Sequence, residues 1–290
     1  MSLALDFLVD LLDLESIEVN IFRGKHPEGH RQRTFGGQVA AQALMAAGRT
    51  VDQGRVHSLH SYFLRPGDSS APTLYEVDRI RDGRSFTTRR VVAIQHGRAI
   101  YNMQASFHRD EVSLEHQVPM PQVPSPESIL PVLQRMHSEF GYVEEWNQMP
   151  HPIEQRYIGE LPWDPEHSLE PRQQLWIRAD GTLADDPLLH ACIVTYASDM
   201  NLYDAILAPH RVRWDDGSFM GASLDHCMWF HRDLRADEWM LYDMDSPIAH
   251  AGRGLARGFL FSRDGELKVS IVQEGLTRLL TSPTTSDNHP

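Results

Sequence analysis

Two long, mostly apolar segments of the chain predict helices. The first spans residues 35–48 (FGGQVAAQALMAAG) and the second spans residues 188–207 (LLHACIVTYASDMNLYDAIL). In the second segment, alternating steps of four and three residues connect Cys192, Tyr196, Asp199, Tyr203 and Ile206. This spacing predicts a helix with one buried face. An acidic residue, Asp199, lies in the middle of that face.

The position of Asp199 has two interpretations. Taking a carboxylate out of water is costly unless partners compensate or the group keeps its proton. A structural interpretation pairs the acid with an arginine, or bends the helix so that the acid faces water. A functional interpretation starts from the same loss of water, because Tyr196 and Tyr203 would partly desolvate the acid. Desolvation raises the pKa of a carboxylate toward the range that suits a general base.

Alternating apolar and polar residues predict antiparallel strands in the first third of the chain. The stretch VHSLHSYFLRPGD precedes RIRDGRSFTTRRVVAIQHGRAIYNMQASF, in which Asp-Gly and His-Gly pairs predict turns. The last third repeats this order with GASLDHCMWFHRD and GRGLARGFLFSRDGELKVSIVQEG. Four pairs of landmarks recur at offsets of 165 to 169 residues: Ser58 and Ser223, Gly83 and Gly252, Gly97 and Gly265, and Gln104 and Gln273. The repeat predicts an internal duplication.

Each half therefore places one long helix before a set of antiparallel strands, which predicts the α+β class with a sheet curled round each helix. Between the halves lies VPMPQVPSPESILPVL, whose closely spaced prolines predict an extended connector. The predicted organisation is a first repeat over residues 1–110, a proline-rich linker over 111–169 and a second repeat over 170–290.

Composition narrows the possible partners. The chain has 290 residues and a formal net charge of −13, which argues against a broad nucleic-acid surface. It has no apolar run of the roughly 20 residues that a membrane span needs, so we expect no stable membrane insertion. The start MSLALDFLVDLLDLESIE predicts an amphipathic helix rather than a signal peptide. Two cysteines give no disulfide framework, and the end TTSDNHP lacks a Ser-Lys-Leu signal, so we expect a cytoplasmic protein.

Five phrases of the sequence, taken in order, resemble one known family. They are FRGKHPEGHRQRTFGGQVAAQAL, VHSLHSYFLRPGD, YASDMNL, LDHCMWFHR and VQEG. Similar phrases occur in the TesB-type acyl-CoA thioesterase II family. The resemblance implies the double hot dog fold, in which two helix-wrapping sheets join side by side into one continuous antiparallel sheet. It also implies a cofactor-independent enzyme that hydrolyses acyl-CoA to free fatty acid and coenzyme A.

The same resemblance implies a catalytic set that holds and activates a water: Asp199 of YASDMNL, Ser223 before LDHCMWFHR, and Gln273 of VQEG. Many relatives have threonine at the serine position, and serine keeps the hydroxyl. By themselves, the serine is more often structural and the glutamine could turn to solvent at a strand end.

Strand periodicity supports an inward Gln273, because the residue continues the face formed by Leu267, Val269 and Ile271. A neutral amide can both donate to and accept from a water. The first half has Ser58 and Gln104 at the repeat-equivalent positions, but its helix carries no acid. We therefore expect one active site per chain.

Other residues are candidates for substrate contacts. The start of the first helix, Gly36, Gly37 and Gln38, is expected to form a wall of the site, with backbone N–H groups that polarise the thioester carbonyl. Arginines that could meet the coenzyme A phosphates, or merely keep strand faces soluble, are Arg81, Arg84, Arg89, Arg90, Arg253 and Arg257. The spacing of His57, His60, His226 and His231 predicts no metal site. Continuous strand edges predict a homodimer or homotetramer.

Three other functions fit parts of the sequence. A serine hydrolase is disfavoured because GASLD (residues 221–225) resembles a nucleophile elbow but lacks the closing glycine and opens a strand. A hot-dog hydratase would use the D-x-N of residues 199–201, but its histidine would fall at position 204, which is aspartate. An acyl-CoA-binding protein without catalysis would fit the fold, yet it has no need of an acid, a hydroxyl and an amide together.

Overall fold

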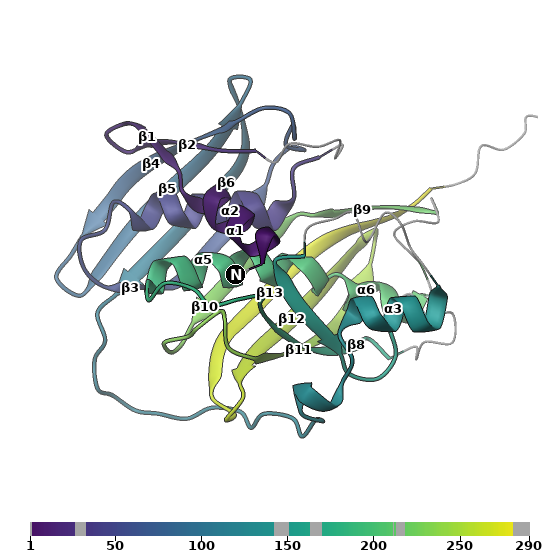
Figure 1. The fold of residues 1–290 in the computed structure, drawn as a ribbon. Coiled ribbons are helices and arrows are strands. Elements are labelled where there is room, and N and C mark those ends of the chain that lie inside the picture. Colours follow the sequence, from purple (N-terminus) through teal and green to yellow (C-terminus); the bar gives the residue numbers. More distant parts are fainter. Residues whose placement is uncertain are drawn as a thin grey trace, which may run out of the picture.

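The computed structural model describes residues 2–26, 33–141, 151–162, 170–210, 212 and 218–280. Within these residues the strands form one 13-stranded sheet in which every pairing is antiparallel. Two long helices, α2 and α5, pack against each other and lie on one side of this sheet (Figure 1). The architecture confirms the α+β prediction.

The first half of the chain contributes two helices and six strands. In order they are α1 (Leu3–Leu12), β1 (Glu15–Glu18), β2 (Ile21–Gly24), α2 (Gly36–Gly48), β3 (Arg55–Phe63), β4 (Thr73–Asp82), β5 (Phe86–Gln95) and β6 (Arg98–His108). The helix predicted over residues 35–48 is α2, with Phe35 as its N-cap residue.

The rest of the chain contributes the remaining elements. In order they are η1 (Pro126–Ser128), α3 (Val132–Phe140), β7 (Ile153–Tyr157), β8 (Arg172–Ala179), α5 (Pro187–Asn201), α6 (Asp204–Leu207), η2 (Ala208–His210), β9 (Phe219–Ser223), β10 (Asp225–Phe230), β11 (Met240–His250), β12 (Arg253–Ser262) and β13 (Leu267–Leu279). The range 111–169 thus holds η1, α3 and β7, and β7 pairs with β8 at the edge of the sheet.

The strand order displays the duplication. Along the sheet the order is β1-β2-β4-β5-β6-β3-β10-β13-β12-β11-β8-β7, and β9 pairs with β13 beside this path. The run β4-β5-β6-β3 is therefore mirrored by β11-β12-β13-β10. The two copies meet where β3 pairs with β10, for example at Leu59 opposite Met228. One continuous sheet made of two copies confirms the double hot dog prediction.

The predicted turns join the strands of each copy. His96 and Gly97 have φ of 49° and 71° between β5 and β6, and Ala251 and Gly252 have φ of 51° and 73° between β11 and β12. Positive φ at both central residues is typical of the tight turns that match strand twist. At the Asp-Gly turn, the Gly83 N–H donates to the Phe86 carbonyl oxygen over 3.0 Å.

The second predicted helix is shorter than its apolar pattern suggests. Helix α5 begins after Asp186, which accepts from the Leu188 and Leu189 N–H groups, and it ends at Asn201. The chain resumes as the short helix α6. The prediction of one continuous helix to residue 207 was therefore wrong, because α5 ends at Asn201 and α6 is a separate short helix. Close packing of the Tyr203 ring against Gly275 accompanies this break.

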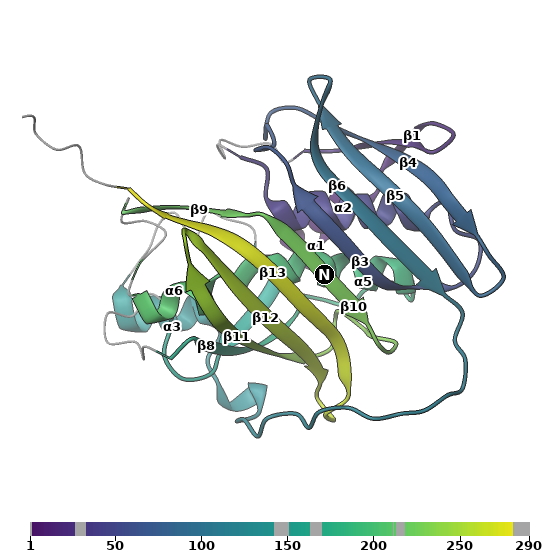
Figure 2. The ribbon, with the colours of Figure 1, turned by 180° about the vertical axis from the view of Figure 1, so that it is seen from behind.

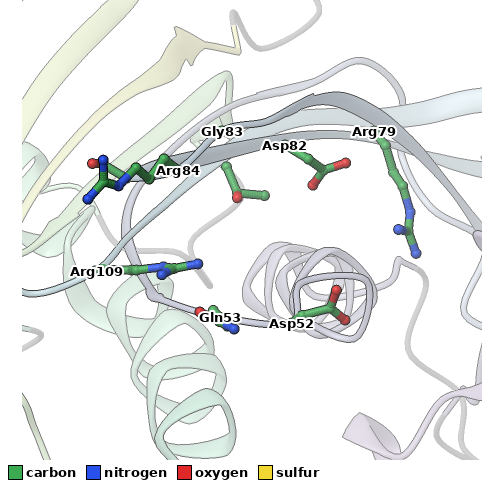
Figure 3. A pocket seen from close by; sticks show the side chains of 9 residues that line it. Asp52, Gln53, Arg79, Asp82, Gly83, Arg84 and Arg109 are labelled. Carbon is green, nitrogen blue, oxygen red and sulfur yellow. The ribbon is translucent and has the colours of Figure 1, made fainter.

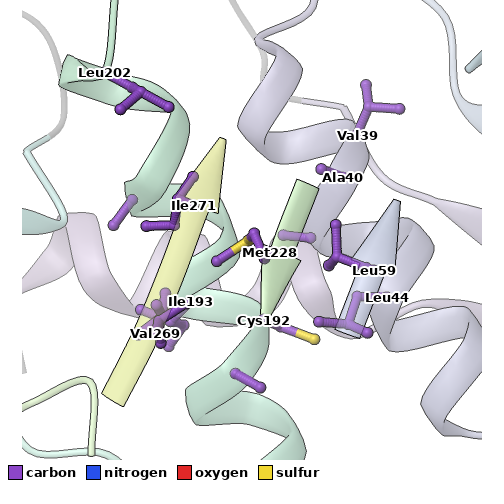
Figure 4. Packing of buried hydrophobic residues seen from close by; sticks show 14 of the residues in the cluster. Val39, Ala40, Leu44, Leu59, Cys192, Ile193, Leu202, Met228, Val269 and Ile271 are labelled. Atoms are coloured by element: carbon purple, nitrogen blue, oxygen red, sulfur yellow. The ribbon is translucent and has the colours of Figure 1, made fainter. Parts of the chain in front are cut away.

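The helices pack closely because small residues line their contact. An added Cβ on Gly48 would lie 2.4 Å from Leu188 Cδ1, and one on Gly37 would lie 2.5 Å from the Tyr196 carbonyl oxygen. Figure 4 shows the shared core, to which both helices and strands β3, β10 and β13 contribute Val39, Ala40, Leu44, Leu59, Cys192, Ile193, Met228, Val269 and Ile271. The two copies therefore share one hydrophobic core.

The proline-rich linker runs past the second half of the sheet (Figure 2). Trp176 Nε1 donates to the Pro124 carbonyl oxygen over 2.9 Å. Met120, Val123 and Ile129 pack on a second cluster that contains Trp176 and Phe261. Among the described residues, no helix is both long and apolar enough to cross a membrane.

Candidate active site

Asp199 lies where the two long helices meet. On its own helix face, Cys192, Tyr203 and Ile206 are buried, whereas Tyr196 and Asp199 remain partly exposed. The start of α2 closes over the acid, and an added Cβ on Gly36 would lie 2.7 Å from Asp199 Oδ2. The missing side chain of Gly36 thus leaves the space that the carboxylate occupies.

The other two predicted catalytic residues reach the same place from the sheet. Ser223, the last residue of β9, donates from Oγ to Asp199 Oδ1 over 3.2 Å. Gln273 of β13 donates from Nε2 to Ser223 Oγ over 2.8 Å. The Gln273 side chain is 1% exposed, so the period-two prediction of an inward glutamine is confirmed.

Two further residues extend this group, and the sequence analysis did not assign them to the site. His226 of β10 is fully buried, and its Nδ1 lies 2.5 Å from Gln273 Oε1. Its Nε2 lies 2.8 Å from Ser198 Oγ, on the residue of α5 next to Asp199. A signal was present, because His226 alternates with the inward residues Met228 and Phe230 along the strand.

Burial sets the charge states of the two ionisable groups. Loss of water raises the pKa of Asp199 above its ordinary value, opposed by His226, Gln273, Ser223 and the Gly37 N–H. Loss of water also lowers the pKa of His226, opposed by Asp199. The site therefore holds a carboxylate of raised basicity beside a neutral imidazole.

This geometry favours activation of a water over attack by the serine. The Ser223 hydroxyl faces a carboxylate, and the nearby imidazole hydrogen-bonds to Gln273 rather than to the serine. Ser223 thus lacks the histidine partner that a serine nucleophile needs, and the serine that does contact His226, Ser198, is completely buried. A basic carboxylate next to a hydroxyl and an amide can instead hold a water and accept its proton.

The predicted wall residues surround the acid in different ways. The Gly37 N–H hydrogen-bonds to Asp199 and lowers its pKa. Gln38 is 4% exposed, and its Nε2 donates over 3.4 Å to the carbonyl oxygen of Lys25. Gly36 is the wall residue whose missing side chain faces the carboxylate.

Four of the six candidate arginines have acidic partners. Arg89 is 1% exposed and binds Asp82, Thr50 and backbone oxygens in the interior. The more exposed Arg90, Arg253 and Arg257 pair with Asp78, Glu274 and Asp245. Among the described residues, Arg81 and Arg84 have no ion-pair partner.

Arg84 lines a pocket of about 390 Å³ beside the β4–β5 turn. Arg79 and Arg109 also line it, together with Asp52 and Asp82 (Figure 3). Arg79 donates to Asn20 Oδ1 over 3.0 Å. Since Asp82 is already paired with Arg89, the arginines leave this pocket with an excess of positive charge.

The described part of the first half lacks a second set of this kind. Ser58 is buried. Gln104 is exposed, because its side chain lies on the outward face of its strand. Gln104, which the repeat offset of 169 residues pairs with Gln273, is therefore not its structural equivalent, because Gln104 faces outward. No group of three or more His, Cys, Asp or Glu residues in the described ranges is arranged to hold a metal ion.

The chain combines a continuous double hot dog sheet with an acid, a hydroxyl and an amide that meet between the end of α5 and the start of α2, an arrangement compatible with a hot dog thioesterase. The family model described as acyl-CoA thioesterase matches residues 152–276, and the model described as acyl-CoA thioesterase N-terminal domain matches residues 25–108. The chain belongs to the acyl-CoA thioesterase family.

Similar proteins agree with this membership. Acyl-coenzyme A thioesterase 8 of Mus musculus is 42% identical over 288 residues, covering 94% of this chain and 89% of that protein. The crystal structure of acyl-CoA thioesterase II TesB2 from Mycobacterium marinum is 42% identical, with a TM-score of 0.79 over 94% of this chain and 99% of the other. A hot dog protein from Alicyclobacillus acidocaldarius, 19% identical, shares the fold with a TM-score of 0.78 over 95% of this chain and 99% of that one.

Proposed function

We propose that the protein hydrolyses acyl-CoA to free fatty acid and coenzyme A, with Asp199 as the general base for a water that Ser223 and Gln273 help to hold. The observation that carries this proposal is the hydrogen-bonded contact of the three side chains, which come from α5, β9 and β13. Membership of the acyl-CoA thioesterase family supports the substrate class.

The proposed reaction has two steps. Asp199 takes a proton as the water oxygen attacks the thioester carbonyl carbon, and the carbonyl π electrons move to the oxygen. The tetrahedral intermediate then collapses, the C–S bond breaks, and the departing thiolate of coenzyme A takes the proton from Asp199. Backbone N–H groups at the start of α2 polarise the carbonyl oxygen in this proposal, except that of Gly37, which binds Asp199.

Isotope labelling under single turnover tests the reaction. Excess enzyme is mixed with acyl-CoA in oxygen-18 water, and the product acid and the intact protein are examined by mass spectrometry. We expect one label in the acid and no acylated protein. An acyl group trapped on Ser223 would refute the water mechanism, and binding of acyl-CoA without thiol release would favour a binding protein.

We also propose that Arg84 contacts the phosphates of coenzyme A. Its support is the excess positive charge of the pocket that Arg84 shares with Arg79 and Arg109. Arg84→Ala should raise KM for acyl-CoA with little change in kcat, because a phosphate contact acts equally on ground state and transition state. The matched control is Arg23→Ala, since Arg23 pairs with Glu15 on the same half of the sheet. A fall in kcat at constant KM would contradict the phosphate contact.

A homodimer or homotetramer acting in the cytoplasm is the proposed working form. Exposed apolar side chains on the first half, such as Tyr62 at 64% and Ile80 at 50%, support self-association. The unpaired thiols of Cys192 and Cys227 support a reducing compartment. Light scattering of the purified protein tests the assembly, and a monomeric mass would refute it.

A further inference from the structure

A single chain of hydrogen bonds connects two adjacent residues of helix α5 through side chains of the sheet. From Ser198 it passes to His226 of β10, on to Gln273 of β13, then to Ser223 of β9, and it ends at Asp199. The imidazole of His226 hydrogen-bonds to neither Ser223 nor Asp199. Apart from its electrostatic effect on the pKa of Asp199, this buried ring reaches the site through Gln273.

The direction of the Gln273 amide depends on the histidine. An amide has one accepting end and one donating end. Gln273 Nε2 donates to Ser223 Oγ, so Oε1 is the end that faces His226 Nδ1 over 2.5 Å. This contact is attractive when Nδ1 carries a hydrogen and repulsive when it does not. If the hydrogen of the His226 ring were on Nε2 instead, the Gln273 amide would flip, and its oxygen would face Ser223.

The surroundings of the ring favour hydrogen on Nδ1. Ser198 is completely buried, and its hydroxyl lies 2.8 Å from His226 Nε2. Because burial lowers the pKa of His226, the ring is neutral and carries one N–H. The Ser198 hydroxyl has one hydrogen and two acceptors within reach, Nε2 and the Thr195 carbonyl oxygen, which lies 2.9 Å away. The accepting Gln273 Oε1 beside Nδ1 favours the arrangement in which this hydrogen goes to Nε2 and the ring hydrogen lies on Nδ1. Ser61 Oγ also donates to the His226 carbonyl oxygen over 2.8 Å, which fixes the backbone of the residue.

We propose that His226 is a positioning residue whose Nδ1–H holds the Gln273 amide with its nitrogen toward Ser223 and the reacting water. Ser198 lies behind it and offers a hydroxyl that can donate to Nε2. This inference rests on the proposed function, because it gives the glutamine of that site its orientation. In this orientation the Gln273 nitrogen also faces Asp199, whose pKa it lowers through a side-chain hydrogen bond.

Two substitutions of similar shape separate the donor from the packing. Asn can place an amide nitrogen where Nδ1 lies, whereas Leu places a methyl group there. We expect His226→Leu to lower kcat about 10- to 100-fold, the scale on which small misplacements act, with little change in KM. His226→Asn should keep most of the activity. Equal losses in the two variants would overturn the role of the donor.

A double-mutant cycle with Gln273→Ala tests whether the histidine acts through the glutamine. We expect His226→Leu to cost little in the Gln273→Ala background, because the group that it positions is already gone. Losses that multiply would overturn the positioning role and leave the proposed function intact. Normal turnover of Gln273→Ala alone would instead remove the glutamine from the proposed function, and the positioning role with it. If His226→Leu does not fold, Ser198→Ala is taken through the same cycle.

A spectroscopic measurement checks the tautomer of His226 in the unsubstituted protein. Nitrogen-15 NMR of the full protein labelled at histidine should show His226 protonated at Nδ1 and unprotonated at Nε2 at neutral pH. His226→Asn identifies the signal. A neutral ring with its hydrogen on Nε2 would overturn the proposal.

Discussion

At the scale of single residues, the acid in the middle of an apolar helix face lies where α5 meets the start of α2 and remains partly exposed. Asp199 sits where packing is dense enough to raise its pKa and where part of the helix face remains exposed. A carboxylate in this state is a stronger base than one in water, and its partial exposure lets it meet a water. The same burial makes its ionised form a cost to the folded state.

Replacement of the acid should therefore change activity and stability in opposite directions. Asp199→Asn should lower kcat about 10²–10⁴-fold, the usual contribution of a general base. Because the pKa of Asp199 is higher in the folded than in the unfolded chain, its ionisation opposes folding at neutral pH. The variant should thus have a higher Tm at pH 7, and this gain should shrink as the pH falls through the raised pKa.

Kinetics and thermal unfolding of the same preparations measure both effects. Asp245→Asn is the control, since Asp245 pairs with Arg257 on the surface of the sheet. Turnover of Asp199→Asn close to that of the parent protein would remove the acid from the mechanism.

The serine should tune the pH dependence of the reaction. Activity should fall as the pH decreases through the pKa of Asp199, because the protonated acid cannot accept a proton. The Ser223 hydroxyl donates to the carboxylate and lowers its pKa. Ser223→Ala should therefore move the acid limb of kcat/KM to higher pH, besides lowering the rate by less than Asp199→Asn does. A limb that stays in place or moves to lower pH would contradict this hydrogen bond as a source of the pKa.

At the scale of elements, the contact between α2 and α5 serves the site at one end and stability at the other. Glycines mark both ends of α2. An added Cβ would meet the carboxylate of Asp199 at Gly36 and the side chain of Leu188 at Gly48. A carboxylate held by several hydrogen bonds has less freedom to move than the end of a leucine side chain.

Alanine at these two glycines should separate activity from stability. Gly36→Ala should lower kcat, because the methyl group displaces the carboxylate from its hydrogen bonds. Gly48→Ala should lower the Tm while the activity per folded molecule stays near that of the parent. Steady-state kinetics and thermal scans of both variants provide the comparison. Full activity in Gly36→Ala would show that the carboxylate tolerates displacement.

At the scale of the whole molecule, the two halves depend on each other. Strands β3 and β10 pair across the junction, and α2 and α5 bury their faces together. Separation of the halves would expose two strand edges and a large apolar surface. The halves should therefore unfold as one cooperative unit.

Two optical probes distinguish one unit from two. All six tryptophans lie after residue 140, so tryptophan fluorescence reports on the second half, whereas far-ultraviolet circular dichroism reports on both halves. The two urea transitions should coincide in midpoint and slope. A dichroism curve with a second transition that fluorescence lacks would show that the halves unfold separately.

The sequence alone determined the class of fold, the duplication and the three residues that meet at the site. Periodicity along one strand is a local property, so it placed Gln273 inward, and turn residues such as Gly97 located the hairpins. The resemblance of short phrases supplied the roles that we propose for Asp199, Ser223 and Gln273.

Only the tertiary structure decided which further residues hydrogen-bond to that site and which of the candidate residues lie away from it. His226 joins the hydrogen-bond chain because β10 lies next to β13, a pairing between strands about 45 residues apart that local periodicity cannot encode. Gln104 shares the repeat offset of Gln273 yet faces outward, because a one-residue shift in a strand exchanges its two faces. Arg89 looked like a surface arginine in an alternating strand, and burial beside Asp82 and Thr50 made it structural. In each case the deciding contact joins segments that are distant in sequence.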